Sequence, residues 1–136
     1  MKYISQKEIP DYLIACVKHS EQILELKDDW DTEGSKGYKE ETWKNAINFL
    51  IDYATQVYNR HKQLIDIPKI YPGANGSIDI LWETNEYRLL INITESDNYA
   101  TYYGDTPNGQ KIEGEFNTHN YNLNLLLITI SQTKQS

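Results

Sequence analysis

The second half of the chain constrains the fold most, because its apolar residues recur at every second position. Apolar and polar side chains alternate along two runs, Ile78 to Glu83 and Arg88 to Ile93. This period is typical of β-strands that bury one face. A turn at Asn85-Glu86 joins the runs and sets their register, which places Trp82 opposite Leu89. The sequence therefore predicts an antiparallel hairpin.

Two further strands are expected after this hairpin, so that the sheet is a four-stranded antiparallel meander. They run from Tyr99 to Asp105 and from Lys111 to Asn117, and a turn at Pro107-Asn108-Gly109 joins them. The facing of the last strand stays open. A glycine bulge in the turn would point its apolar residues inward, and a plain two-residue turn would point them outward. Lys69 to Tyr71 is an optional short strand at the edge.

Two amphipathic helices are expected before the sheet. Apolar residues at helical spacing predict a first helix from Pro10 to Lys27 and a second from about Glu40 to Lys62. The loop between them makes the pair a helical hairpin. After the sheet, Tyr121 to Gln132 carries leucines at helical spacing, which favours a closing helix.

The chain is therefore expected to be one α+β domain over residues 1–136. In this interpretation an N-terminal helical hairpin (residues 1–66) packs on the β-meander (residues 67–118). A C-terminal helix (residues 119–136) closes the fold.

Composition and charge argue against several functional classes. The formal net charge is −7, and no basic cluster interleaves with aromatic residues, so direct binding of nucleic acid is not expected. The chain has no apolar run of about 18 residues for a membrane span, and its N-terminus lacks the apolar run of a signal peptide. The single cysteine, Cys16, excludes an internal disulfide framework and fits a reducing compartment. We expect a cytoplasmic protein.

Two short motifs resemble a widespread family of small uncharacterised bacterial proteins. They are Trp30-Asp31-x-x-Gly34 and Asn75-Gly76-Ser77-Ile78-x-Ile80-x-Trp82-Glu83. The family pattern is a Trp-Asp-x-x-Gly loop followed by an (Asp/Asn)-Gly-Ser-Ile-x-Ile-x-Trp-Glu strand, and the resemblance covers residues 20 to 115 or so. It implies no established activity. The chain departs from the pattern between Glu33 and Glu41, where charged residues replace small residues and proline.

Residues 29–40 have the outline of an EF-hand-like calcium loop. Acidic side chains stand at positions 1, 3, 5 and 12 of this loop, which are Asp29, Asp31, Glu33 and Glu40. Glycine stands at position 6, as in such loops. Ca²⁺ is therefore the one candidate cofactor, with these four carboxylates as its candidate ligands.

A structural turn is the favoured alternative for the same loop. Glu33 is longer than the side chains that calcium loops prefer at its position, and Lys36 stands where an apolar residue would bridge to a paired loop. In this interpretation Asp31 binds the backbone of the turn and Gly34 adopts positive φ. Trp30 then plugs the end of the helical hairpin.

The outer face of the predicted sheet carries a candidate contact surface. The predicted registers place Leu81, Leu90 and Tyr103 in a row across three strands. Asp79, Asn92 and Thr101 border the row on one side, and Glu83, Arg88 and Asp105 border it on the other. An apolar stripe with a polar rim is typical of a partner or dimer surface. The candidate partner-binding residues are Leu81, Leu90, Tyr103, Glu83, Arg88 and Asn92; in the alternative, the C-terminal helix covers the row.

No catalytic residues are predicted, because the three histidines fall in different elements and Cys16 lies among apolar neighbours. The expected function is that of a small, non-enzymatic, cytosolic interaction module that binds another protein or itself as a homodimer. One alternative is a calcium-binding module that uses residues 29–40. Another is an acidic inhibitor or antitoxin of a basic or nucleic-acid-binding protein, whose binding would weaken steeply with salt.

Overall fold

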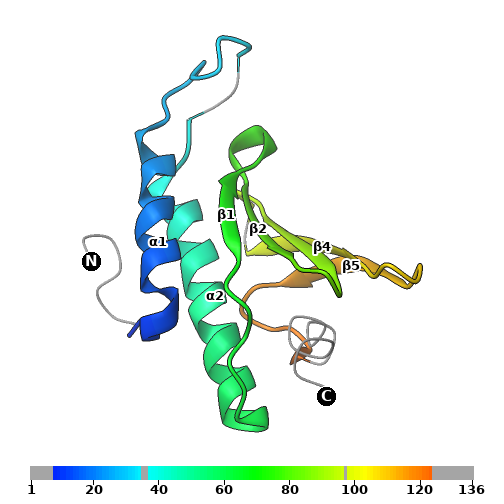
Figure 1. The fold of residues 1–136 in the computed structure, drawn as a ribbon. Coiled ribbons are helices and arrows are strands. Elements are labelled where there is room, and N and C mark those ends of the chain that lie inside the picture. Colours follow the sequence, from blue (N-terminus) through cyan, green and yellow to red (C-terminus); the bar gives the residue numbers. More distant parts are fainter. Residues whose placement is uncertain (1–7, 35–36, 97, 124–136) are drawn as a thin grey trace.

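The computed structural model describes residues 8–34, 37–96 and 98–123, in which helices cover one face of an antiparallel sheet (Figure 1). The helical segments are η1 (Asp11–Leu13), α1 (Ile14–Ser20), η2 (Glu21–Glu25), α2 (Glu40–His61) and η3 (Ala74–Gly76), where η denotes a 3-10 helix. The strands are β1 (Lys69–Pro72), β2 (Ile78–Glu83), β3 (Arg88–Ile93), β4 (Tyr99–Asp105) and β5 (Lys111–Asn117). The predicted α+β class is confirmed.

The helices α1 and α2 run antiparallel, and the loop between them extends beyond their ends (Figure 1). α2 begins where predicted and ends at His61, because Lys62 adopts a left-handed conformation with φ of 55°. The first helix is shorter than predicted, since α-helical geometry ends at Ser20 and a 3-10 segment follows. The hydroxyl of Ser20 donates to the carbonyl of Val17 at 2.5 Å. A side chain that bonds back to the preceding turn weakens and bends an α-helix.

The sheet has five strands in the order β1-β2-β3-β4-β5, and the predicted number of four was wrong. The fifth is the short edge strand that the sequence left optional, and it places Ile70 opposite Ile80. This strand has only four residues, too few for the alternation of apolar and polar side chains to establish it, and one of the four is a proline, which is rare inside strands. The register predicted for β2 and β3 is confirmed, with Trp82 opposite Leu89.

The apolar residues of β5 point toward the helices, which settles the facing that the sequence left open. Gly109 has φ of 91°, and its N–H donates to the carbonyl of Thr106 at 3.0 Å. This turn places Phe116 opposite the buried Ala100. On the same face Gly114 leaves room for Tyr102, because a Cβ added to this glycine would lie 2.8 Å from the phenol oxygen.

The core lies between α2 and the inner face of the sheet. On the sheet side, seven side chains of the described strands have no exposed surface; they are Ile78, Ile80, Trp82, Leu89, Ile91, Ile93 and Ala100. On the helix side, Tyr53 packs against the ring of Trp82 with a centroid distance of 6.2 Å. The alternation in β2 and β3 thus buries one side chain in two, as the period predicts.

The predicted C-terminal helix falls mostly on residues 124–136, which lie outside the described residues. The part that is described does not begin as a helix, because an isolated β-bridge joins Asn117 to Asn120. The chain then passes Tyr121, whose ring lies 5.1 Å from that of Phe49 in α2. Tyr121 also donates to the carboxylate of Asp52 at 3.0 Å, so this segment returns to the helical side of the sheet.

Candidate functional site

Leu81, Leu90 and Tyr103 lie side by side on the outer face of the sheet, the face away from the helices. The two edge strands lengthen this row, because Lys69 of β1 pairs with Leu81 and Glu113 of β5 pairs with Tyr103. We call these five residues the central row. Its three middle side chains are partly exposed, and those at its ends are exposed. The central row thus has an apolar middle and opposite charges at its two ends.

A polar network borders one side of the central row. Asn92 donates from Nδ2 to the Asp79 carboxylate at 2.7 Å and to the Ser77 hydroxyl at 2.8 Å. The hydroxyl of Ser77 donates in turn to the carbonyl of Ala74 at 2.6 Å. Thr101 lies beside Asn92 on β4, in the predicted register. Since an amide nitrogen has two hydrogens, these bonds engage both donors of Asn92 and fix its orientation.

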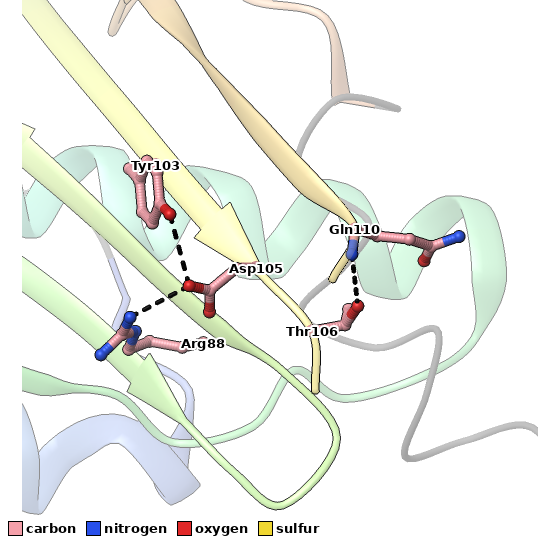
Figure 2. A network of polar contacts seen from close by, with 5 residues as sticks. All are labelled: Arg88, Tyr103, Asp105, Thr106 and Gln110. Atoms are coloured by element: carbon pink, nitrogen blue, oxygen red, sulfur yellow. Dashed lines mark hydrogen bonds and ion pairs between the residues drawn. The ribbon is translucent and has the colours of Figure 1, made fainter. Parts of the chain in front are cut away.

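An ion pair borders the other side of the central row (Figure 2). Nη2 of Arg88 lies 3.0 Å from Oδ2 of Asp105, and the phenol of Tyr103 donates to the same oxygen at 3.4 Å. The hydrogen bond that Arg88 donates to Asp105, together with the negative charge of this carboxylate, raises the pKa of the Arg88 guanidinium. Glu83 lies opposite Arg88 as predicted, but the guanidinium hydrogen-bonds the carboxylate on the other neighbouring strand. The Tyr103 ring is thereby tethered to the charged border.

No helix within the described residues lies over the central row, because α1 and α2 contact the strands from the opposite face (Figure 1). The C-terminal helix that would provide an alternative cover falls on residues outside those described. Just before them, Tyr121 and Leu123 join the core on the helical side. The last described residues therefore run on the face opposite the central row.

The acidic loop between α1 and α2 uses its carboxylates to bind its own backbone. Asp29 accepts the N–H of Gly34 at 2.7 Å, and Asp31 accepts the N–H of Glu33 at 2.9 Å. Glu40 forms an ion pair with Lys44 of α2 at 2.9 Å. Residues 35 and 36 of the loop are outside the described residues. Among all the described residues, including the remainder of this loop, no three His, Cys, Asp or Glu side chains gather as metal ligands. The calcium site at Asp29, Asp31, Glu33 and Glu40 stays a prediction.

Trp30 does not plug the end of the helical hairpin, and that prediction was wrong. Its side chain is 38% exposed and tilts against the ring of Tyr38 with a centroid distance of 6.3 Å. The positive φ that was predicted for Gly34 in the same loop is confirmed, because Gly34 has φ of 85°. The position of an aromatic side chain in a long loop depends on distant contacts such as Tyr38, and local spacing does not encode those.

Cys16 has the properties of a structural residue. Its thiol donates to the carbonyl of Leu13 at 3.3 Å, one turn earlier in the helical segment. Burial raises the pKa of the Cys16 thiol to about 11. Since the thiolate is the nucleophilic form, this side chain is a poor nucleophile at neutral pH.

Sequence reasoning missed two features near the edge of the sheet. It missed the charged ends of the central row. Lys69 belongs to the edge strand that the sequence left optional, and the sequence did not establish on which face of the sheet Glu113 lies. It also missed a groove between the first helical segment and β1. The available signal was the pair of prolines, Pro68 and Pro72, which are typical of an edge strand.

Comparison of the chain with models of protein families, with curated proteins and with solved structures found no match. The family resemblance of the two motifs therefore stays a prediction. Among the helices of the described residues, none combines the length and the apolar character that a membrane crossing requires.

Proposed function

We propose that the chain is a non-enzymatic, cytosolic interaction module whose central row binds the surface of another protein. A second copy of the chain is the partner that fits best. The observation that carries this proposal is the row itself, which is apolar at Leu81, Leu90 and Tyr103 and oppositely charged at its ends. Surfaces with an apolar middle and a polar rim are those that proteins bury against one another.

The charges at the two ends make the central row complementary to itself. Two sheets can pack face to face about a two-fold axis that runs along β3. Leu90 then meets its own copy, Leu81 meets Tyr103 of the second copy, and Lys69 meets Glu113 of the second copy. A two-fold axis across the strands would instead place Lys69 on Lys69. Charge therefore favours the first arrangement.

The area of the face predicts a weak dimer. The sheet has five described strands spaced about 4.8 Å apart, and its three central strands are six or seven residues long. Its face therefore measures about 24 by 20 Å. Two such faces bury about 1,000 Å² in total, which is the lower limit for a specific interface. We expect a dissociation constant that is about micromolar or weaker.

Salt dependence separates this proposal from the acidic-inhibitor alternative. Each copy has a net charge of −7, so two copies repel one another and moderate salt should strengthen the dimer. An acidic inhibitor would behave in the opposite way, because its binding to a basic partner weakens as salt rises.

Sedimentation velocity over a range of concentrations up to about 1 mM tests the proposal. Leu90→Asp should shift the chain to a monomer while its circular dichroism spectrum stays unchanged. The matched control is Leu64→Asp, because Leu64 is exposed (48%) and does not belong to the central row. The proposal fails if the parent chain is monomeric throughout, or if Leu90→Asp associates as strongly as the parent chain.

A further inference from the structure

A groove of about 660 Å³ lies between the first helical segment and β1. Its helical wall includes Cys16, His19 and Ile23, and its other wall includes Ile67 and Lys69. The volume falls within the range of about 300 to 1,000 Å³ that is typical of ligand sites. Ile67 is 58% exposed, so an apolar side chain is accessible beside this concave surface.

The groove carries a local positive character in an acidic chain. Lys69, whose side chain lies on the outer face at this edge of the sheet, and His19 are the basic residues among those that line the groove, and the described lining residues include no carboxylate. The chain as a whole has a formal charge of −7. An anionic group is therefore favoured in this groove over other parts of the acidic surface.

The strand wall of the groove also offers backbone groups. β1 is the first strand of the sheet and pairs with β2 alone among the described strands. Gly73 donates to the carbonyl of Ser77 at 2.8 Å, and hydrogen-bonded and non-hydrogen-bonded pairs alternate along an antiparallel ladder. Ile70 and Pro72 thus belong to non-hydrogen-bonded pairs. The N–H and carbonyl of Ile70 and the carbonyl of Pro72 point away from β2.

We propose that this groove binds an extended peptide that adds to the free edge of β1 and places a carboxylate at Lys69. One residue of the peptide exchanges two hydrogen bonds with Ile70, and the residue two positions along the peptide donates its N–H to the carbonyl of Pro72. Apolar side chains of the peptide fill the space between Ile23 and Ile67. Addition of a strand to a sheet edge gives affinity through the main chain, and the side-chain pockets give specificity.

The prolines favour a foreign peptide over a second copy of β1. If two β1 strands paired antiparallel about Ile70, Pro72 of one copy would meet Pro68 of the other. Neither proline has an N–H to donate, so this pairing would be limited to the two bonds at Ile70. A peptide without proline supplies the missing donors.

The site shares Lys69 with the central row, and two charge reversals distinguish the two surfaces. Heptapeptides selected from a random library on the full chain are labelled with fluorescein, and their binding is measured by fluorescence polarisation. We expect the selected peptides to alternate apolar residues and to carry a carboxylate. Lys69→Glu should weaken their binding at least tenfold, while Lys111→Glu, the matched reversal on the opposite edge strand, should not. Adding Glu113→Lys to Lys69→Glu should restore self-association but not peptide binding.

A second variant and two further readouts locate the peptide. Ile67→Asp should abolish binding, and the exposed Leu64→Asp should retain it. N-methylation of successive peptide residues should impair binding at every second position, as strand addition requires. Bound peptide should also slow the reaction of Cys16 with N-ethylmaleimide, and this is the one cysteine of the chain. A library without enrichment, binding that survives Lys69→Glu, or an even N-methylation profile would each overturn the proposal.

Discussion

The phenol of Tyr87 donates a hydrogen bond of 2.7 Å to the carboxylate of Asp66. The indole of Trp82 donates to the main-chain carbonyl of the same residue, also at 2.7 Å. Asp66 lies in the linker between α2 and β1, whereas Tyr87 and Trp82 belong to the β2–β3 hairpin. The linker is thereby fixed to the hairpin through both its side chain and its backbone, and this positions the edge strand β1.

Tyr87→Phe should lower the free energy of unfolding by about 1–3 kcal/mol, because the bond to a carboxylate is lost from a side chain that is 1% exposed. Urea denaturation followed by tryptophan fluorescence measures the change. Tyr58→Phe is the control, since Tyr58 is exposed on α2, and it should change stability by less than about 0.5 kcal/mol. Equal stability of the two variants would contradict the role assigned to Asp66.

Stability should fall as the pH rises above about 10, the ordinary pKa of tyrosine. Burial and the nearby carboxylates of Asp66 and Asp52 raise the pKa values of Tyr87 and Tyr121 in the folded chain. A group with a raised pKa in the fold stabilises the fold fully below its unfolded pKa, and this stabilisation is lost as pH rises toward the folded value. Denaturation between pH 9 and pH 11 should show this decline. A double variant, Tyr87→Phe with Tyr121→Phe, should show a smaller decline, and an unchanged slope would refute the assignment.

Gly76→Ala should destabilise the fold more than Gly34→Ala. Both glycines have positive φ, at 79° and 85°, so alanine strains the backbone at either position by about 1 kcal/mol. At Gly76 the new Cβ would also lie 2.8 Å from the carboxyl carbon of Glu95, whereas nothing lies within 4 Å at Gly34. Thermal unfolding of the two variants compares them directly. If their melting temperatures fall equally, the contact with Glu95 does not constrain this turn.

Calcium should leave the melting temperature of the metal-stripped chain unchanged, because Asp29 and Asp31 already accept backbone N–H groups. Differential scanning fluorimetry with a few millimolar calcium, and with Asp31→Asn as control, makes the comparison. A stabilisation that saturates below about a millimolar and disappears in Asp31→Asn would instead establish the calcium-binding alternative.

The parts of the fold that the sequence predicted are those where local period and turn length act together. The register of β2 and β3 follows from alternation and a two-residue turn, and it places Leu81 beside Leu90. The sequence alone could not predict which charged residues lie at the two ends of that row. Lys69 requires the pairing of a four-residue strand, and Glu113 requires the positive φ of Gly109 to set the facing of β5. Both depend on contacts between elements rather than on local pattern.

The position of the Trp30 side chain and the groove beside β1 illustrate the same limit. Trp30 rests on Tyr38, and the groove forms only when Ile67 and Ile23 are brought together from different elements. Neither arrangement leaves a periodic trace in the sequence. The sequence therefore predicted the middle of the central row, at Leu81, Leu90 and Tyr103, and the structure added its two ends, Lys69 and Glu113.

The most direct test of the central claim is a charge exchange within the central row, followed by sedimentation equilibrium. Lys69→Glu and Glu113→Lys should each weaken self-association at least about fivefold, because each places like charges opposite one another. The double variant restores opposite charges in exchanged positions, and it should associate about as strongly as the parent chain. If the double variant stays as weak as the single variants, or if all four chains associate equally, the central row is not the surface through which this protein binds its own copy.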